Sequence, residues 1–311
     1  MLKNLEEICS NQQGAWQIGF KKGRWIHENH LLIKAAIHKM KSKKKGAIIF
    51  VDFKKAYDSI DHFWLYTQFA RLNGVLWSNL IMDVVCGGSA KLLGDKRFIS
   101  INRGVRQGDP LSPLLFNVCL APLLDSISNS FKLFKIAVPY IAFADDLAIF
   151  CNNQLEDNET IRTLQKFKDI SGLDINFSKT KLFAYSNINY SCVEKVNKFR
   201  YLGITYKKNG KILWDDLFKK FKERLERVTN IYKYSSLLHR IILINSYVLS
   251  ILIFPIRVAK LPKGFANKVY LAIRSCLGSR GTRVRLTRLL GARSYGGYGL
   301  INLKEMALRL K

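Results

Sequence analysis

An α+β region followed by an all-helical region is the fold class that this sequence predicts. Up to about residue 205, short apolar runs of strand length alternate with amphipathic segments of helical length. From Lys211 onward, long helical patterns replace the short apolar runs. Such an order is typical of an α+β domain joined to a helical one. With 311 residues, of which 48% are hydrophobic, the chain is long enough to bury a sizeable core in more than one domain.

Glycines and prolines divide the α+β region into its elements. Gly46 ends a helical segment, Leu31–Ile37 with its basic tail Lys39–Lys45, and precedes an apolar strand, Ala47–Phe53. The further expected strands are Lys96–Ile101, Val138–Ala142, Leu147–Cys151, Lys181–Tyr185 and Phe199–Thr205, and the further expected helices are His62–Asn73, Trp77–Val85, Leu114–Leu124 and Glu156–Ile170. A hairpin turn is expected between the strands that end at Ala142 and begin at Leu147.

Three long helices are expected in the second region, which begins near residue 206. They are Trp214–Tyr234, Leu238–Leu252 and Ala266–Cys276. The longest uncharged run, residues 241–256, falls short of the roughly 20 apolar residues that cross a bilayer. We therefore interpret it as a buried helix, and no membrane partner is expected.

The charge of the chain indicates a polyanionic partner. There are 51 Lys and Arg residues against 23 Asp and Glu residues, which gives a formal net charge of +28. Residues 200–311 contain 24 of the basic and 5 of the acidic residues, so this third of the chain supplies +19 of the surplus. A basic helical region suits a nucleic-acid duplex, whose phosphates are met by Lys and Arg. A solvated basic surface is the alternative interpretation.

Three carboxylates are placed where a sequence rarely leaves them without a partner. Asp52 lies in the apolar strand Ala47–Phe53, and Asp145 with Asp146 lies between two apolar runs. Burying an unpaired charge is costly, and converging carboxylates favour a hard divalent cation, Mg²⁺ or Mn²⁺. Two such ions are the usual device for in-line phosphoryl transfer, so the pattern predicts a nucleotidyl transferase. A charged β-turn is the alternative interpretation of the Asp pair.

Five motifs in order resemble the motif series of reverse transcriptases, and in detail the non-LTR (LINE-type) retrotransposon branch. They are Asp52 to Tyr57, Arg106-Gln-Gly-Asp-Pro-Leu-Ser-Pro113, Phe143-Ala-Asp-Asp146, Gly172 to Lys181 with Asn176 and Lys179-Thr-Lys181, and Tyr201-Leu-Gly-Ile204. The opening Gln17-Ile-Gly-Phe-Lys-Lys-Gly-Arg24 is similar to the segment before the first catalytic strand in that branch. The later Gly296-Gly-Tyr-Gly-Leu300 is similar to a glycine-rich segment of elements with a restriction-like endonuclease.

The resemblance implies a right-hand polymerase. Residues 1–46 would be partial fingers, 47–205 the palm, and 206–311 a basic helical thumb with the start of the following linker. Because a fuller finger region precedes the Gln17 segment in the family, the chain is expected to be truncated at both ends. Asp52 and Asp145 would bind two Mg²⁺ ions, with Mn²⁺ as a substitute, and Phe53 and Asp146 would complete the metal site.

The resemblance also assigns roles to residues around the acids. Tyr57 would be a steric gate against a ribose 2′-OH, and Gln107 with Gly108 would contact the nucleotide. Lys179 would protonate the departing pyrophosphate, with Lys181 as the rival. The primer and template would contact Tyr201, Leu202, Gly203 and Arg24. The alternatives are a core aromatic for Tyr57, a helix-start turn at Gln107, an exposed lysine at 179 and an ordinary strand-turn at Tyr201.

The implied function is RNA-directed DNA synthesis from a primer 3′-OH. Its partners would be an RNA template, a DNA primer or target DNA, and dNTPs, while the oligomeric state is left open. The expected location is the nucleus, after translation in the cytoplasm. A group II intron maturase and a viral RNA-dependent RNA polymerase are the related alternatives, and Tyr57 speaks against the latter because that enzyme must accept a ribose. A non-catalytic nucleic-acid-binding remnant is the third alternative.

Overall fold

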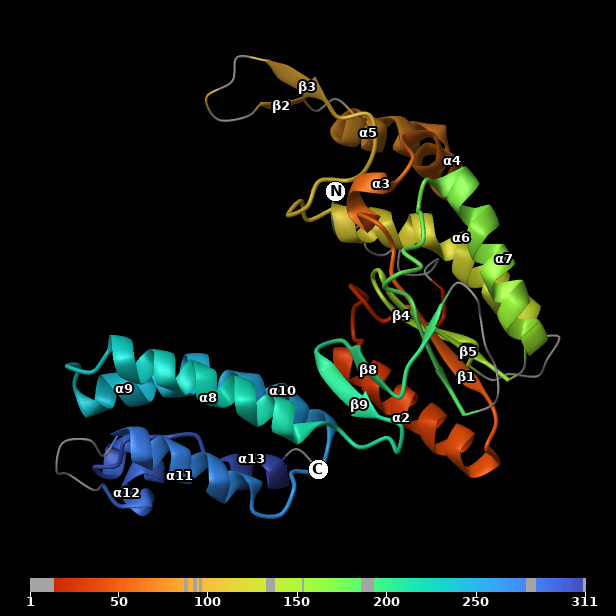
Figure 1. Ribbon diagram of the computed structural model, residues 1–311. Helices are drawn as coiled ribbons and strands as arrows, with labels where there is room; N and C mark the ends of the chain where they lie inside the picture. Colours follow the sequence, from red (N-terminus) through yellow and green to blue (C-terminus); the bar gives the residue numbers. More distant parts are fainter. Residues whose placement is uncertain are drawn as a thin grey trace. The chain divides into compact units, whose positions relative to one another are not determined.

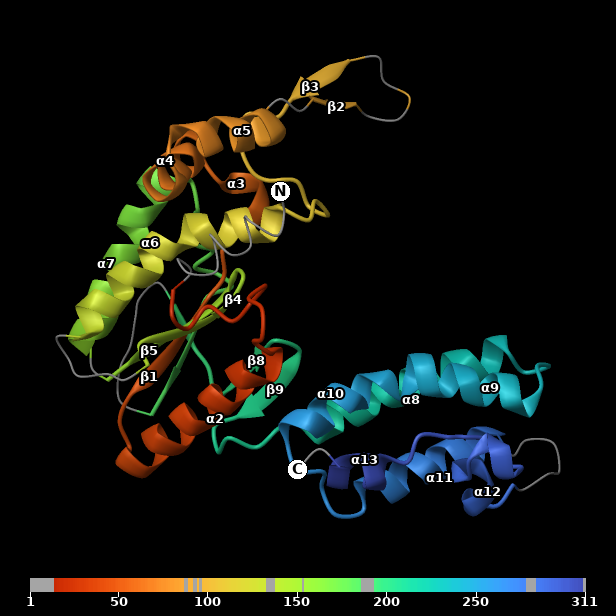
Figure 2. The ribbon, with the colours of Figure 1, turned by 180° about the vertical axis from the view of Figure 1, so that it is seen from behind.

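The structure is a computed structural model, and it describes residues 14–86, 89–91, 94, 97–132, 138–152, 154–185, 193–277 and 284–309 (Figures 1 and 2). The chain forms two compact units. The first comprises residues 1–202 with 208–210, and the second comprises residues 203–207 with 211–311. Strands and helices alternate in the first unit and helices dominate the second, so the predicted fold class is confirmed. The finer division into fingers, palm and thumb stays a prediction.

A five-stranded sheet forms the centre of the first unit, in the order β4-β5-β1-β6-β7. Its strands are β1 (Ala47–Val51), β4 (Tyr140–Phe143), β5 (Asp146–Cys151), β6 (Lys181–Ala184) and β7 (Glu194–Lys195). β1 pairs antiparallel with β5 on one side and with β6 on the other, and β7 runs parallel to β6. All of β1 is buried, which explains why its sequence is apolar throughout rather than alternating.

Alternate residues of β1 face two apolar layers. Ala47, Ile49 and Val51 belong to the main core cluster of the unit. Phe50 faces the other side of the sheet, where its ring stacks on Phe199 with the centroids 4.2 Å apart. The period of two along a strand places these residues on opposite faces, so both faces of the sheet are covered.

Helices surround this sheet (Figures 1 and 2). They are α2 (Ile26–Lys43), α3 (Ala56–Ser59), α4 (His62–Asn73), α5 (Val75–Cys86), α6 (Ser112–Lys132) and α7 (Gln154–Ser171), and a separate hairpin is formed by β2 (Ser89–Lys91) and β3 (Phe98–Ser100). α6 and α7 lie side by side. α2 is longer than the sequence predicts, because Glu28 accepts a hydrogen bond from the Trp25 backbone N–H at 2.7 Å and starts the helix early.

The expected strand Phe199–Thr205 is wrong as a single element. It is a hairpin of β8 (Lys198–Tyr201) and β9 (Ile204–Lys207), and the chain passes from the first unit to the second within it. Leu202 and Gly203 form the turn with φ values of 42° and 83°. Positive φ at both turn positions is the type I′ geometry that suits tight hairpins. Leucine rarely adopts a positive φ. Gly203 was therefore the only residue of this turn that indicated a turn from the sequence.

The second unit is a set of helices around its own apolar core (Figures 1 and 2). They are α8 (Trp214–Ile231), α9 (Leu237–Leu243), the π-helix η1 (Ile244–Val248), α10 (Ser250–Val258), α11 (Phe265–Leu277), α12 (Leu286–Leu290), the 3-10 turn η2 (Arg293–Tyr295) and α13 (Leu303–Arg309). The expected helices Trp214–Tyr234 and Ala266–Cys276 are confirmed with shifted ends, as α8 and α11, whereas the expected helix Leu238–Leu252 is wrong as a single element. α8 buries Phe218, Phe221, Leu225 and Val228, the helical spacing of a single apolar stripe.

The uncharged run at residues 241–256 is helical but broken. It spans the end of α9, the π-helix η1 and most of α10. Val248, Leu249 and Leu252 in this run are completely buried within the core of the second unit. No single helix among the described residues is long and apolar enough to cross a membrane; only the pair Leu237–Val248 and Ser250–Val258, bent by 46°, meets that length and composition together.

Candidate active site

Asp52 directly follows β1, where the middle strand leaves the sheet. Its backbone N–H donates to Thr180 Oγ1 at 3.2 Å, and its carbonyl oxygen accepts from the Asn176 N–H at 2.7 Å. The next residue, Phe53, forms an isolated antiparallel β-bridge with Ile175. All three partners lie in the segment between α7 and β6. That segment therefore fixes the direction in which the chain carries Asp52 away from the sheet.

Asp145 and Asp146 lie in the tight turn between β4 and β5, as the sequence predicts. Phe143 pairs with Asp146, which leaves only Ala144 and Asp145 to connect the two strands. Ala144 has a φ of 54°. Positive φ at the first of two connecting residues is the type II′ geometry, which usually requires glycine. The acids are therefore carried on a turn that its own sequence does not favour.

The strand register brings Asp52 and the Asp pair together. Val51 of β1 pairs with Leu147 of β5. Asp52 follows Val51 and Asp146 precedes Leu147, so both acids lie next to the last pair of this ladder. The charge of Asp52 contributes to the raised pKa of Asp145 and of Asp146, as expected for groups that are close together. The three acids thus gather at one edge of the sheet.

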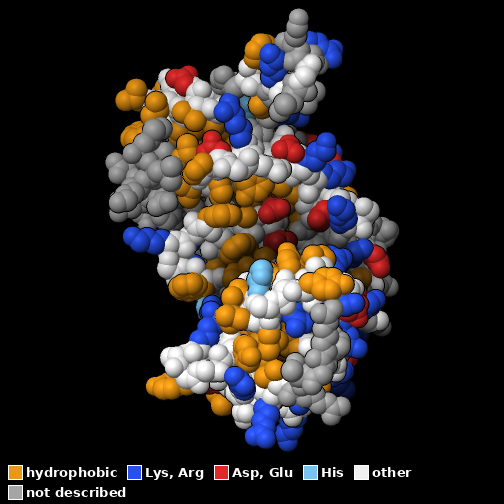
Figure 3. Space-filling view, turned by 90° about the vertical axis from the view of Figure 1, so that its left-hand side faces the viewer, with side chains coloured by type: hydrophobic (Ala, Val, Ile, Leu, Met, Phe, Trp, Pro, Cys, Tyr) orange, Lys and Arg blue, Asp and Glu red, His pale blue; other side chains and the backbone are white. Residues whose placement is uncertain are grey.

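Burial and the neighbouring negative charges raise the pKa values of Asp145 and Asp146. Burial of the carboxyl group raises the pKa of Asp146 to about 6, and the charges of Asp145 and Asp52 add to the shift. Burial likewise raises the pKa of Asp145, with Asp52 contributing again. On the face drawn in Figure 3, acidic side chains gather next to a band of hydrophobic ones. A cation at this edge would relieve the repulsion.

The donor atoms at this sheet edge are of the kind that binds a hard divalent cation. Among the described residues, no group of three or more His, Cys, Asp or Glu side chains is arranged to hold a metal ion. Asp52, Asp145 and Asp146 nevertheless supply carboxylate oxygens at one sheet edge, and the pKa values of the latter two are raised. Carboxylate oxygens are the ligands that Mg²⁺ and Mn²⁺ prefer. The residues present therefore fit the ions that the sequence predicts.

Tyr57 faces the acids from α3. Its ring stacks on Phe116 with the centroids 4.9 Å apart and an interplanar angle of 16°. Burial raises the pKa of the Tyr57 hydroxyl to about 12, and the charge of Asp145 adds to that shift. The ring is half-buried, so it is both a packing residue and a wall of the space beside Asp145.

The loop with Gln107 and Gly108 is attached to the same helix as Tyr57. The Val105 N–H donates to the Tyr57 carbonyl oxygen at 2.7 Å, and Gln107 Nε2 donates to Asp58 Oδ1 at 3.5 Å. Gly108 has a φ of +92° and open space where a Cβ would project. The structure therefore places Gln107 and Gly108 on the same side of the site as Tyr57. Because Gly108 has no side chain, a ligand could approach its backbone closely.

The two lysines that follow Asn176 differ in their partners. Lys181 forms an ion pair with Glu194 and donates to the Ser178 carbonyl oxygen at 3.2 Å. Lys179 is exposed, and none of the described residues forms an ion pair with it. Lys179 is thus the lysine whose ammonium group is available to meet a ligand.

Tyr201 is tied to the carboxylate turn, whereas Arg24 is not. The Tyr201 hydroxyl donates to the Asp146 carbonyl oxygen at 3.3 Å. Leu202 and Gly203 follow as the turn between β8 and β9. Arg24 lies just before α2 and pairs with Glu28 at 2.9 Å. The structure describes no contact between Arg24 and the acids.

Three buried polar side chains near the acids were given no role by the sequence interpretation, although Gln17 and Thr180 lie within its motifs. Gln17, Asn29 and Thr180 are completely buried. Gln17 and Asn29 bind the β4 edge and its turn, and Thr180 binds Asp52. A polar residue between apolar neighbours, such as Gln17 between Trp16 and Ile18, was the available signal. Its partner in the turn, Ala144, is more than a hundred residues away, so the sequence could not name it.

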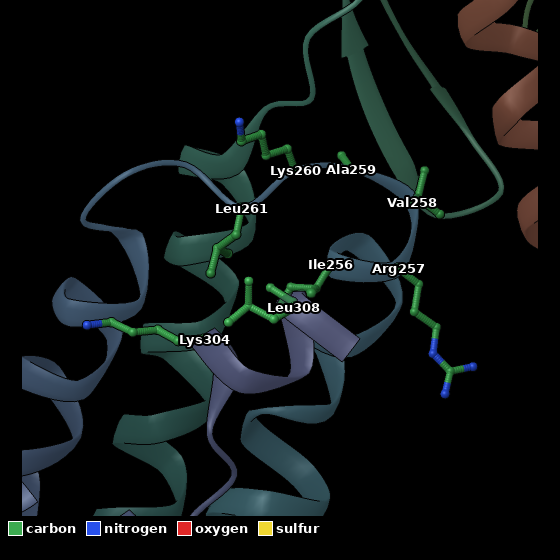
Figure 4. A pocket seen from close by; sticks show the side chains of 9 residues that line it. Ile256, Arg257, Val258, Ala259, Lys260, Leu261, Lys304 and Leu308 are labelled. Carbon is green, nitrogen blue, oxygen red and sulfur yellow. The ribbon is translucent and has the colours of Figure 1, made fainter. Parts of the chain in front are cut away.

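The second unit contains an apolar pocket of about 390 Å³ (Figure 4). None of the described residues that line it is acidic. Ile256, Leu261 and Leu308 turn toward one another, while the charged ends of Arg257, Lys260 and Lys304 point away. Because this lining offers no ligand for a metal ion, the candidate active site is the carboxylate edge.

The fold and this site together define the polymerase-palm class of protein. A mainly antiparallel sheet carries an acid at the end of its middle strand and two acids on the adjoining hairpin, and a helical unit follows in the chain. A match of residues 1–206 to the profile "Reverse transcriptase (RNA-dependent DNA polymerase)" identifies the family within that class. The chain belongs to the reverse transcriptase family.

The similar curated proteins are polyproteins of R2 retrotransposons, which agrees with the expected non-LTR branch. The chain is 28% identical over 183 residues to a Pol polyprotein from the type-1 retrotransposable element R2 of Popillia japonica, covering 55% of this chain and 26% of that one. It is 28% identical over 243 residues to its counterpart from Nasonia vitripennis, covering 68% and 24%. The chain therefore spans about a quarter of the length of these relatives.

Solved structures with the same fold are telomerases. The chain matches apo telomerase from Candida tropicalis with a TM-score of 0.54 and 13% identity, over 100% of this chain and 55% of that one. It matches telomerase from Candida albicans, solved in complex with a fragment of telomeric RNA, with a TM-score of 0.53 and 11% identity, over 95% and 55%. At these identities the likeness shows the fold alone.

Proposed function

We propose that this chain is the RNA-directed DNA polymerase core of a non-LTR retrotransposon. The observation that carries the proposal is the meeting of three acids at one sheet edge: Asp52 directly follows the Val51–Leu147 pair, Asp146 directly precedes it, and Asp145 is beside Asp146 on the turn. Family membership supports the reaction class, and the R2 relatives support the type of element. Its substrates would be an RNA template, a DNA primer or target DNA, and dNTPs.

In the proposed reaction the primer 3′-oxygen forms a bond to the α-phosphorus of a dNTP, and the bond to pyrophosphate breaks. Asp52, Asp145 and Asp146, with the Phe53 carbonyl oxygen, would hold two Mg²⁺ ions. When bound, these ions supply Lewis acidity toward the primer hydroxyl and offset the charge of the pyrophosphate. The acids themselves orient the reacting groups.

The remaining residues would act on the nucleotide. Gly108, with open space where a Cβ would project, would let the backbone approach the incoming nucleotide. The Tyr57 ring, held by stacking on Phe116, would occupy the space that a 2′-OH needs. Lys179 would give a proton to the departing pyrophosphate, because Lys181 is engaged with Glu194. Tyr201 would hold the carboxylate turn through the Asp146 carbonyl oxygen.

The test is primer extension on an RNA template by the purified chain, with and without Mg²⁺. Synthesis should depend on the metal and fall to background in Asp145→Asn. Asp174→Asn is the matched control, since Asp174 is a nearby acid that pairs with Lys54 and Lys168 on the surface. Binding of nucleic acid without any synthesis by the wild-type chain would favour the non-catalytic remnant instead.

A further inference from the structure

The side chain of Gln17 binds the carboxylate turn from inside the protein. Gln17 is completely buried. Its Oε1 accepts a hydrogen bond from the Ala144 N–H at 3.1 Å, and its Nε2 donates to the Ala144 carbonyl oxygen at 3.3 Å. A carboxamide that binds both backbone groups of one residue fixes the peptide planes on both sides of it. The second of these planes is the peptide that joins Ala144 to Asp145.

Ala144 is the residue of the turn that most needs such a partner. Its φ of 54° lies in the left-handed region, which a side chain with a Cβ rarely adopts. The surrounding structure must therefore hold this conformation. Because Gln17 satisfies the N–H and the carbonyl oxygen in this conformation, it stabilises the strained form of the turn specifically.

The segment around Gln17 is itself firmly placed. The Gly19 N–H donates to the same Gln17 Oε1 at 3.1 Å, and Asn117 Nδ2 donates to the Gly19 carbonyl oxygen at 2.9 Å. The Ile18 N–H donates to the Ala142 carbonyl oxygen at 2.9 Å. Gly19 is so close to the turn that a Cβ on it would lie 2.5 Å from the Ala144 nitrogen. The segment is thus a rigid support on which the turn rests.

We infer that Gln17 is a positioning residue for Asp145: through Ala144 it sets the direction in which the Asp145 carboxylate points. The inference rests on the proposed function, in which Asp145 holds a metal ion. It requires no contact of Gln17 with substrate or metal. Residues that orient a metal ligand in this way typically contribute about ten- to hundredfold to metal affinity or activity.

The test compares Gln17→Met with Asn117→Leu. Methionine keeps the length of the side chain and removes all three hydrogen bonds, whereas Asn117→Leu loosens the same segment without touching the turn. Four quantities are measured for each: the amide hydrogen exchange rate at Ala144, the affinity for Mn²⁺ by electron paramagnetic resonance, and kcat and KM for dNTP incorporation. Thermal unfolding reports the purely structural effect of each variant.

Gln17→Met should speed exchange at Ala144, weaken Mn²⁺ binding about tenfold or more, and lower kcat about ten- to hundredfold with KM for the dNTP little changed. Asn117→Leu should lower the unfolding temperature while Mn²⁺ affinity and kcat stay within about threefold of the wild type. Equal effects of the two variants, or unchanged Mn²⁺ affinity in Gln17→Met, would overturn the inference.

Gly19→Ala covers the case in which Gln17→Met does not fold. Its Cβ displaces the turn while the Gln17 amide remains, so it should reproduce the loss of Mn²⁺ affinity. Wild-type affinity in Gly19→Ala would contradict the role of this support. A wild-type chain that neither binds Mn²⁺ nor makes DNA would overturn the proposed function; faster exchange at Ala144 in Gln17→Met would then still support Gln17 as the residue that holds the turn.

Discussion

At the scale of residues, buried polar side chains rather than apolar ones set the geometry of the acids. The Thr180 hydroxyl fixes the chain at Asp52, and the Gln17 carboxamide fixes the turn before Asp145. The acids were identified from the sequence because a charge in an apolar run is unusual. Their supports were not, since a single Gln or Thr looks the same whether its partner is a neighbour or a strand far along the chain.

Tyr57 gives a residue-scale prediction about sugar selection. Tyr57→Val should raise the use of rNTPs relative to dNTPs by about tenfold or more, because the ring no longer fills the space beside Asp145. The measurement is the ratio of kcat/KM for dNTP and rNTP incorporation. Tyr57→Phe keeps the ring and should keep the ratio. An unchanged ratio in Tyr57→Val would make Tyr57 a packing residue only.

His30 gives a residue-scale prediction about acid stability. Burial lowers the pKa of His30 to about 4, although a hydrogen bond with the Leu202 backbone acts in the opposite direction. The unfolded chain takes up the proton near pH 6.5, so the folded state loses stability as pH falls from about 6.5 to about 4. At pH 5 this loss is about 2 kcal/mol.

The measurement is the free energy of unfolding at pH 7 and pH 5 for the wild type and His30→Gln. The variant should lose less stability between the two pH values, by about 2 kcal/mol. Comparing the two pH values within each protein removes the effect of the substitution at neutral pH. An equal drop in both proteins would mean that His30 is not the group that takes up the proton.

At the scale of elements, the strength of the local pattern decided what could be predicted. The apolar stripe of α8 repeats over several turns, so its existence was clear from the sequence, and only its end was placed three residues too late. The β8–β9 hairpin was missed because Leu202, at the first turn position, is not a turn-forming residue. The π-helix η1 left no sequence signal, since its extra residue changes hydrogen bonding rather than composition.

The π-helix gives an element-scale prediction. Asn245 Nδ2 donates to the Gly299 carbonyl oxygen at 2.8 Å, and its Oδ1 accepts from the Ile301 N–H at 3.0 Å. Asn245→Ala should destabilise the protein by about 1–3 kcal/mol, because two backbone groups lose their partner. Thermal and urea unfolding measure this. Ser246→Ala, which removes only a hydrogen bond within the helix, should change stability by less than about 0.5 kcal/mol, and equal losses would contradict this role of Asn245.

At the scale of the whole molecule, charge separates the two tasks of a polymerase. The carboxylate edge repels phosphates unless a cation is bound, while the region from residue 200 onward carries most of the positive surplus. The division of charge follows from composition alone, because net charge needs no knowledge of the fold, and the division of tasks stays a prediction. Composition could not predict how the basic side chains are arranged, which depends on helix packing.

The basic region gives a prediction about binding. The affinity for an RNA–DNA duplex should fall as the salt concentration rises. A plot of the logarithm of the association constant against the logarithm of the salt concentration should have a slope of about −3 or steeper, which corresponds to several neutralised phosphates. Replacing the exposed Lys219 and Arg227 of α8 by Gln should make the slope shallower by about one for each phosphate that is no longer neutralised. Fluorescence anisotropy at several salt concentrations measures the slope. An affinity for the duplex that does not change with salt concentration would contradict binding through the basic side chains.

The central claim is that Asp52, Asp145 and Asp146 form one metal-dependent site for DNA synthesis. Its most direct test is the single-turnover rate of adding one dNTP to a DNA primer on an RNA template, measured against Mg²⁺ concentration for the wild type and Asp52→Asn. We expect a rate that rises more steeply than first order in Mg²⁺, since two ions are needed, and no detectable incorporation by an Asp52→Asn variant that still binds the duplex. Incorporation without Mg²⁺, or near-normal incorporation by Asp52→Asn, would contradict the claim.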